Sequence, residues 1–207
     1  MEAKLKRDFT LVGHAQSGKT TLAESILFFC KATTRKGNVM QGSTVSDYNE
    51  DEQDRKISIN ASFLKVDYKG HQIQMIDTPG YMDFVGETVA ALQATDAAIL
   101  VVDAVNGVEV GTEDVWDRLN QMGLPRIIFI NKIDKSDAKS DAVIAAIQEQ
   151  LSNKAVKVDL ESSGFIEAIA ESDDKLLEKY LEKGTLTPDE IQGVLRQAVV
   201  QAKIFPI

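Results

Sequence analysis

The residues best suited to chemistry form one short stretch near the amino terminus. Residues 13–20 read Gly-His-Ala-Gln-Ser-Gly-Lys-Thr, a G-x-x-x-x-G-K-[ST] pattern between an apolar run and a helical pattern that begins at Leu22. The glycines let backbone N–H groups converge on an anion, and the helix N-terminus adds its partial positive charge. The pattern predicts a phosphate-binding loop, in which Lys19 reaches the β- and γ-phosphates and the Thr20 hydroxyl holds Mg²⁺. The loop residues expected at the nucleotide are Gly13, His14, Ala15, Gln16, Ser17, Gly18, Lys19, Thr20 and Thr21.

A carboxylate occurs later in the chain at a position that suits the same site. Residues 71–76 follow a strand pattern at 62–68 and a Lys-Gly turn, and they end in Asp77-Thr78-Pro79-Gly80. A carboxylate at the carboxyl end of a strand, beside a phosphate loop, is placed to bind Mg²⁺. We therefore expect Asp77 at the metal and the nucleotide, and the Gly80 backbone N–H near the γ-phosphate. D-T-P-G alone is a common turn, and its position gives it meaning.

A third motif selects the base. The apolar run 126–130 ends in Asn-Lys-Ile-Asp at 131–134. The Asp134 carboxylate can accept hydrogen bonds from both N1–H and the exocyclic amine of guanine, whereas adenine offers no such pair of donors. Asn131 would bond the base edge and brace the phosphate loop, and the Lys132 stem would cover the ring. The N-K-x-D spacing after a strand indicates a guanine nucleotide.

The surrounding elements predict an α/β fold. Strand patterns at 8–12, 62–68, 71–76, 97–103 and 126–130 alternate with helical patterns at 18–31, 84–94 and 111–122, whereas 32–60 is polar without periodicity. We expect a doubly wound P-loop NTPase fold with a mostly parallel sheet and one antiparallel hairpin strand. The carboxyl-terminal part, 140–202, reads as mostly helical, with helices at 140–151, 164–171, 175–183 and 188–202. Short strands are expected at 155–160 and 203–207. All of 1–207 would form one nucleotide-binding domain.

Composition excludes several classes of function. The 207 residues carry a formal charge of −9, which argues against broad electrostatic binding of nucleic acid and leaves a local contact open. We also expect no direct sequence-specific binding of nucleic acid by this domain. No run approaches the about 18 apolar residues of a membrane span. The single cysteine, Cys30, excludes an internal disulfide, fits a cytoplasmic location and is expected to be buried. We expect a monomer without a membrane partner.

These motifs together resemble the G domain of elongation factor G and related translational GTPases. The loop at 13–20 is similar to the family's first motif, and 77–85, Asp-Thr-Pro-Gly-Tyr-Met-Asp-Phe-Val, is similar to its D-T-P-G-H-x-D-F element. The stretches 107–116, 125–126 and 176–182 are close to the elongation factor G branch. The resemblance covers nearly the whole chain. It implies a GTPase that uses GTP, GDP and Mg²⁺ and acts on the ribosome.

The resemblance also implies residue roles and draws attention to departures. Residues 55–59, Arg-Lys-Ile-Ser-Ile, resemble switch I, usually R-G-I-T-I, so Ser58 would give Mg²⁺ a hydroxyl. Lys56 stands at the family's glycine and is expected to be solvated. Tyr81 stands where the family has the histidine that positions the attacking water. A phenol cannot replace an imidazole in acid–base work near neutral pH, so a factor of roughly 10²–10⁴ in rate is at stake.

Two further departures concern the carboxyl-terminal part. The family's inserted subdomain is strongly reduced, because only four residues separate Leu160 from Phe165. The family's fifth motif would follow Ile207, and later domains would follow it, so we expect weakened guanine affinity in this chain and a truncated domain.

Three hypotheses compete. The first is a GTP-hydrolysing switch domain, slow in isolation, in which Lys19, Gly80 and Tyr81 take part in catalysis. The second is a GTP-dependent binding module that hydrolyses GTP poorly because of Tyr81. The third is a small-molecule kinase that uses ATP, and Asp134 counts against it.

Overall fold

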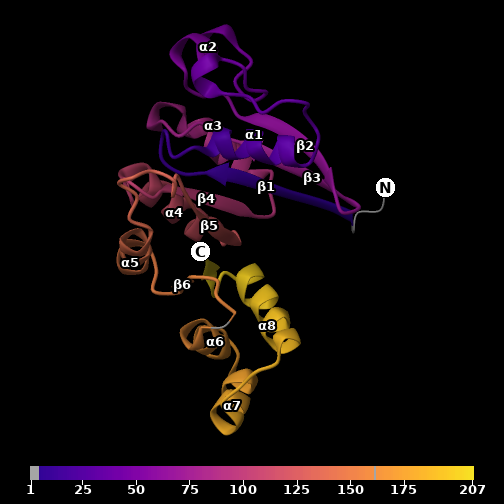
Figure 1. Ribbon diagram of the computed structural model, residues 1–207, viewed down its shortest axis with the longest axis vertical. Helices are drawn as coiled ribbons and strands as arrows, with labels where there is room; N and C mark the ends of the chain where they lie inside the picture. The colour runs from indigo at the N-terminus through magenta and orange to yellow at the C-terminus, as the bar shows by residue number, and fades with distance from the viewer. Residues whose placement is uncertain (1–4, 161) are drawn as a thin grey trace.

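The computed structural model describes residues 5–160 and 162–207 (Figure 1). Its centre is a five-stranded sheet with the order β2-β3-β1-β4-β5. β2 and β3 form the antiparallel pair, and β3, β1, β4 and β5 run parallel to one another. The predicted α/β fold with one antiparallel hairpin strand is confirmed. The strands span Lys6–Val12 (β1), Ser62–Tyr68 (β2), His71–Asp77 (β3), Ala98–Asp103 (β4) and Arg126–Asn131 (β5).

Helices cover both faces of this sheet. Because side chains alternate along a strand, neighbours such as Leu11 and Val12 enter different cores. Leu11 packs with α1 and with β2 and β3, whereas Val12 packs with α3, α4 and α5. These buried clusters hold the carboxyl ends of β1, β3, β4 and β5 at one edge of the sheet. The helices span Lys19–Phe29 (α1), Val85–Gln93 (α3), Val110–Met122 (α4) and Ser140–Gln150 (α5).

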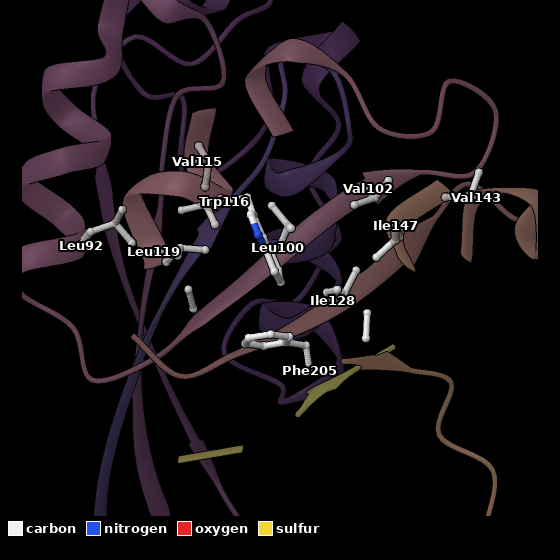
Figure 2. Packing of buried hydrophobic residues seen from close by; sticks show 13 residues of the cluster. Leu92, Leu100, Val102, Val115, Trp116, Leu119, Ile128, Val143, Ile147 and Phe205 are labelled. Atoms are coloured by element: carbon white, nitrogen blue, oxygen red, sulfur yellow. The ribbon is translucent and has the colours of Figure 1, made fainter. Parts of the chain in front are cut away.

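A buried arginine, Arg126, ties the last residues of the chain to α4 beside Trp116 and Phe205, which Figure 2 shows in the core. The Arg126 guanidinium lies 4.0 Å from the ring centroid of Trp116 and 4.5 Å from that of Phe205. It donates to the Trp116 carbonyl at 3.2 Å and to the Asn120 side chain. Burial lowers the pKa of Arg126 to about 10, so it stays protonated at neutral pH. Trp116 and Phe205 meet edge to face at 4.8 Å.

The carboxyl-terminal part is helical, as expected, with its own apolar cluster that includes Phe165, Ile169, Leu176 and Ile191. Figure 1 places α6, α7 and α8 at the end of the long axis opposite α2. The two predicted strands are much shorter than expected, because they pair only with each other over two residues, and residues 157–160 are exposed. The elements are β6 (Ala155–Val156), α6 (Ser163–Ala170), α7 (Asp174–Lys183), α8 (Pro188–Val200) and β7 (Phe205–Pro206).

The polar segment between α1 and β2 contains two short helices that its lack of periodicity concealed. They are η2 (Val39–Gln41) and α2 (Glu50–Arg55). Asn49 and Glu52 form a capping box at the start of α2, so side chains rather than an apolar face define this helix. A further single turn, η3 (Met82–Phe84), leads into α3. Cys30 is half-buried against the α1 core, not fully buried as expected.

Candidate nucleotide-binding site

Two positions in the loop between β1 and α1 can be occupied only by glycine. Gly13 has φ 140°, and a Cβ there would lie 2.3 Å from the Val101 carbonyl oxygen. Gly18 has φ 99°, and its Cβ would lie 2.2 Å from the side-chain nitrogen of Asn131. Both the left-handed region of φ and this lack of space exclude other residues. The loop is therefore pressed against the ends of β4 and β5, where the base-reading motif begins.

Lys19 is the buried cation of the loop. Its side chain is 5% exposed, and Nζ donates to the carbonyl oxygens of Gly13 and His14, each at 2.9 Å. Burial lowers the pKa of Lys19 to about 8, and the charge of Asp77 opposes part of this shift. The ammonium is protonated at neutral pH, and an arriving phosphate would stabilise that form.

Hydroxyls and the buried carboxylate of Asp77 meet beside Lys19, and the buried Asp47 lies close enough to raise the pKa of Asp77. The Thr20 and Ser58 hydroxyl oxygens lie 3.1 Å apart, although 38 residues separate them in sequence. Asp77 is 1% exposed, and neither of its carboxylate oxygens receives a hydrogen bond of regular geometry among the described residues, although the Thr20 and Ser46 hydroxyls lie close enough to lower its pKa. Burial raises the pKa of Asp77 to about 6, while the Thr20 hydroxyl and the Lys19 charge act in the opposite direction. Unpaired carboxylate oxygen beside two hydroxyls is a donor set that fits Mg²⁺.

The end of the Asp-Thr-Pro-Gly segment packs directly on the phosphate loop. A Cβ on Gly80 would lie 2.4 Å from Lys19 Nζ and 2.7 Å from the backbone of Ala15. Tyr81 follows, half-buried, and its hydroxyl lies 3.2 Å from Nε2 of Gln16. Gly80 and Tyr81 therefore lie next to the part of the loop where a terminal phosphate would bind.

The base motif, residues 131–134, lies on the other side of the loop. The Asn131 side chain donates to the Ser17 carbonyl oxygen at 2.9 Å. Lys132 Nζ forms an ion pair with Asp103 at 2.6 Å. Burial alone would raise the pKa of Asp103, but hydrogen bonds from Lys132 and from the Val105 backbone bring it below the usual value. Asp134 lies in the exposed turn after β5, where its carboxylate is open to solvent.

His14 has a structural environment. Its Nδ1 accepts a hydrogen bond from the Gly111 backbone N–H at 3.2 Å, which assigns the ring proton to Nε2. Nε2 faces a carboxylate oxygen of Glu109 at 3.5 Å. The ring therefore joins the loop to the start of α4. Among the remaining loop residues, Ala15 and Ser17 are buried and Thr21 is exposed.

Two buried glutamates that the sequence did not single out hold the segment around α2 in place. Glu24, fully buried on α1, accepts from the backbone N–H groups of Gly37 and Val45 at 2.9 and 2.5 Å. Glu52, 1% exposed, accepts from those of Ile59 and Asn60 at 2.9 and 3.0 Å. The Asn49–Glu52 capping box was the signal available for the second of these. Together they fold the segment over the site.

A cleft of about 640 Å³ lies between these parts. Its walls come from the phosphate loop, from Met40 and 55–58, from Thr78, Gly80 and Tyr81, and from Lys132. Lys56 lines the cleft, half-buried and with a left-handed φ of 58°, a position that fits the alternative of a charge near the phosphates. A larger groove of about 950 Å³, beside Phe28 and Phe29, lies at the end of α1 and contains none of the motif residues.

The comparisons with known proteins agree with this geometry. The family model described as "Elongation factor Tu GTP binding domain" matches residues 4–203. "Elongation factor G 2" from Streptomyces coelicolor is 42% identical over 145 residues, which are 70% of this chain and 21% of that protein. A crystal structure of a Thermus thermophilus protein superposes with a TM-score of 0.88 at 31% identity, covering 97% of this chain and 36% of that one.

The match has clear bounds. The chain spans about a fifth of the length of the curated relative. No helix in the described part of the chain has the length and apolar composition needed to cross a bilayer. Within these bounds the chain belongs to the elongation factor Tu-type GTP-binding domain family, as an elongation factor G-like translational GTPase domain.

Proposed function

We propose that this domain binds GTP with Mg²⁺, hydrolyses it slowly by itself, and acts as the switch of an elongation factor G-like protein on the ribosome. The observation that carries the proposal is a cleft lined by Lys19, Thr20 and Ser58, with the buried Asp77 beside Thr20. Lys132 of the base motif also lines this cleft. Family membership supports the choice of GTP.

The residues divide the work of hydrolysis as follows. Lys19 and the loop N–H groups stabilise negative charge on the phosphates while water attacks the γ-phosphate in line. Thr20, Ser58 and Asp77 would hold Mg²⁺, which when bound neutralises charge between the β- and γ-phosphates. The Gly80 backbone N–H would donate to the terminal phosphate, since Gly80 packs against Lys19 Nζ. Asn131, Lys132 and Asp134 would bind the guanine.

The two flanking segments supply the switch. Residues around Ser58 and residues from Asp77 onward both contact the phosphate loop, through the Thr20 hydroxyl and through Gly80. Contacts that depend on a γ-phosphate would order these segments with GTP and release them after hydrolysis. The ribosome would then bind the ordered, GTP-bound form and the relaxed, GDP-bound form differently.

A second candidate is a GTP-dependent binding module with little hydrolysis. Tyr81 favours it, because the phenol occupies the position of a water-positioning histidine. Single-turnover hydrolysis by the wild type and by Tyr81→His, each with and without ribosomes, separates the candidates. Slow hydrolysis that ribosomes accelerate supports the switch. No hydrolysis in either condition, with GTP still bound, supports the module.

A matched control keeps this comparison clean. Tyr180→Phe changes a phenol on α7 whose hydroxyl donates to Glu167, and Figure 1 places α7 at the end of the molecule opposite α2. It should hydrolyse GTP at the wild-type rate. Loss of hydrolysis in this control would mean that the assay reports folding and not the site.

A further inference from the structure

Gln16 and Tyr81 form a polar contact across the mouth of the cleft, between the phosphate loop and the segment after Asp77. Gln16 Nε2 lies 3.2 Å from the Tyr81 hydroxyl oxygen, and 65 residues separate the two in sequence. Both residues line the cleft. The contact therefore joins the two parts of the site that lie nearest to a terminal phosphate.

The backbone on each side fixes where these side chains point. Gln16 has a left-handed φ of 62°, a conformation that costs a non-glycine residue free energy. Glycine would adopt it without that cost but would have no side chain to reach Tyr81. On the other side, Thr78 donates to the Leu11 carbonyl oxygen at 2.7 Å, and Thr88 donates to that of Pro79 at 3.2 Å. The Tyr81 carbonyl accepts from Phe84 at 3.0 Å.

The direction of the hydrogen bond determines what the phenol can do next. An amide nitrogen donates only, so the Tyr81 oxygen accepts from Gln16 and keeps its own O–H free to donate. A terminal phosphate oxygen is the acceptor that the cleft would bring to it, because Gly80, the preceding residue, packs against Lys19 Nζ. GDP has no γ-phosphate and would leave this donor without an acceptor on the ligand.

We propose that Gln16 is a positioning residue that holds the Tyr81 hydroxyl as a hydrogen-bond donor to the γ-phosphate, so that the pair favours GTP over GDP. The inference rests on the proposed binding of GTP in this cleft and adds the residues that distinguish the triphosphate. It assigns Tyr81 a role as a phosphate donor that does not require the acid–base chemistry of a histidine.

The test is a double-mutant cycle with Gln16→Met, Tyr81→Phe and the double variant. The measured quantity is the ratio of affinities for a non-hydrolysable GTP analogue and GDP, determined by calorimetry with Mg²⁺. Each single variant should lower this ratio about 3- to 10-fold, the range expected for loss of one hydrogen bond. The double variant should lower it no further than the larger single effect, because both substitutions remove the same interaction.

Controls separate positioning from general damage. Gln121→Met, an exposed glutamine on α4, and Tyr180→Phe should leave the ratio unchanged. Gln16→Asn has the same amide on a shorter side chain and should recover less than half of the loss, since reach matters. Thermal unfolding of the nucleotide-free variants checks that each of them folds.

The outcomes are distinguishable. If the wild type binds neither nucleotide, the proposed function fails and the inference fails with it. If the wild type binds both, but the single variants keep its ratio or the double variant shows the sum of two independent losses, only the inference is overturned. A lowered ratio with full coupling supports it.

Discussion

The hydroxyl oxygens of Thr20 and Ser58 lie 3.1 Å apart and join α1 to the segment that follows α2. This contact brings the two elements together at the buried carboxylate of Asp77. In the proposed site, this hydroxyl pair and the carboxylate would give Mg²⁺ three protein oxygens and would link its binding to the position of residues 55–60. The predictions below follow from this arrangement.

Ser58→Ala should raise the Mg²⁺ concentration that GTP binding needs. Loss of one oxygen ligand removes a contact that we assign to the cation, so the Mg²⁺ concentration needed for half-maximal GTP binding should rise about tenfold. Ser58→Thr retains the hydroxyl and should restore the wild-type value. Titration of Mg²⁺ against fluorescent GTP measures both. An unchanged requirement in the alanine variant contradicts the metal role of Ser58.

Nucleotide binding should have a plateau between about pH 6 and pH 8. Asp77, with its pKa raised to about 6, becomes protonated and loses its value as a Mg²⁺ ligand below that pH. Lys19, with its pKa lowered to about 8, loses its positive charge above that pH. Affinity for GDP should therefore fall on both sides. When the titration is repeated in EDTA, the affinity for GDP should fall less steeply below pH 6, because the Mg²⁺-dependent part of the loss is absent. If the affinity falls equally below pH 6 with and without EDTA, Asp77 is not the group responsible.

Asp77→Asn should stabilise the nucleotide-free domain while it impairs binding. The raised pKa means that the ionised carboxylate is costly in the folded state, and this cost is fully present above pH 6 and disappears as pH falls toward the unfolded value near 4. A neutral amide removes it, so stability at pH 7 should rise by on the order of 1–3 kcal/mol. Urea unfolding at pH 7 and pH 4.5 measures this, and the gain should shrink at the lower pH. A loss of stability at pH 7 contradicts the assignment.

Glu52→Ala should loosen the segment after α2. It leaves the backbone N–H groups of Ile59 and Asn60 without their acceptor, which costs about 1–3 kcal/mol locally. Trypsin should then cut after Arg55 or Lys56 several-fold faster. Glu50→Ala, an exposed position on the same helix, is the matched control and should be cut at the wild-type rate. Equal rates in both variants would show that the Glu52 contacts do not hold the segment.

Asp134→Asn should change base preference. An amide can donate to the exocyclic oxygen of xanthine but loses the double acceptor for guanine, so guanine affinity should fall about 10²-fold and xanthine affinity should rise. Competition of labelled GDP by GDP and by xanthosine diphosphate measures the ratio. Continued preference for guanine would remove Asp134 from the base site.

Much of this fold can be predicted from local sequence patterns. The strands β1, β4 and β5 can be predicted from their apolar runs, because burial on both faces of a sheet requires apolar residues. The phosphate loop can be predicted from its glycine spacing, because a close approach of backbone segments requires glycine. Helix α2 was missed because it has no apolar face, and 157–160 alternates like a strand without a longer partner to pair with. Local patterns cannot supply such partners.

The same limit applies within the site. The motifs identified Lys19, Asp77, Asn131 and Asp134 one by one, since each follows a strand or a loop of recognisable form. The hydrogen bonds of Glu24 to residues 37 and 45, and of Gln16 to Tyr81, join distant segments and required the fold. Residue spacing in the sequence does not reveal side chains that hold distant segments of a site in place.

The central claim is that a guanine nucleotide lies in the cleft between Lys19 and Asp134. Calorimetric titration of the folded domain with GDP, and in parallel with ADP, in magnesium buffer at pH 7 tests it most directly. The account predicts saturable heat with GDP and none with ADP under the same conditions. A folded sample that gives no heat with GDP, or equal binding of ADP, would contradict it.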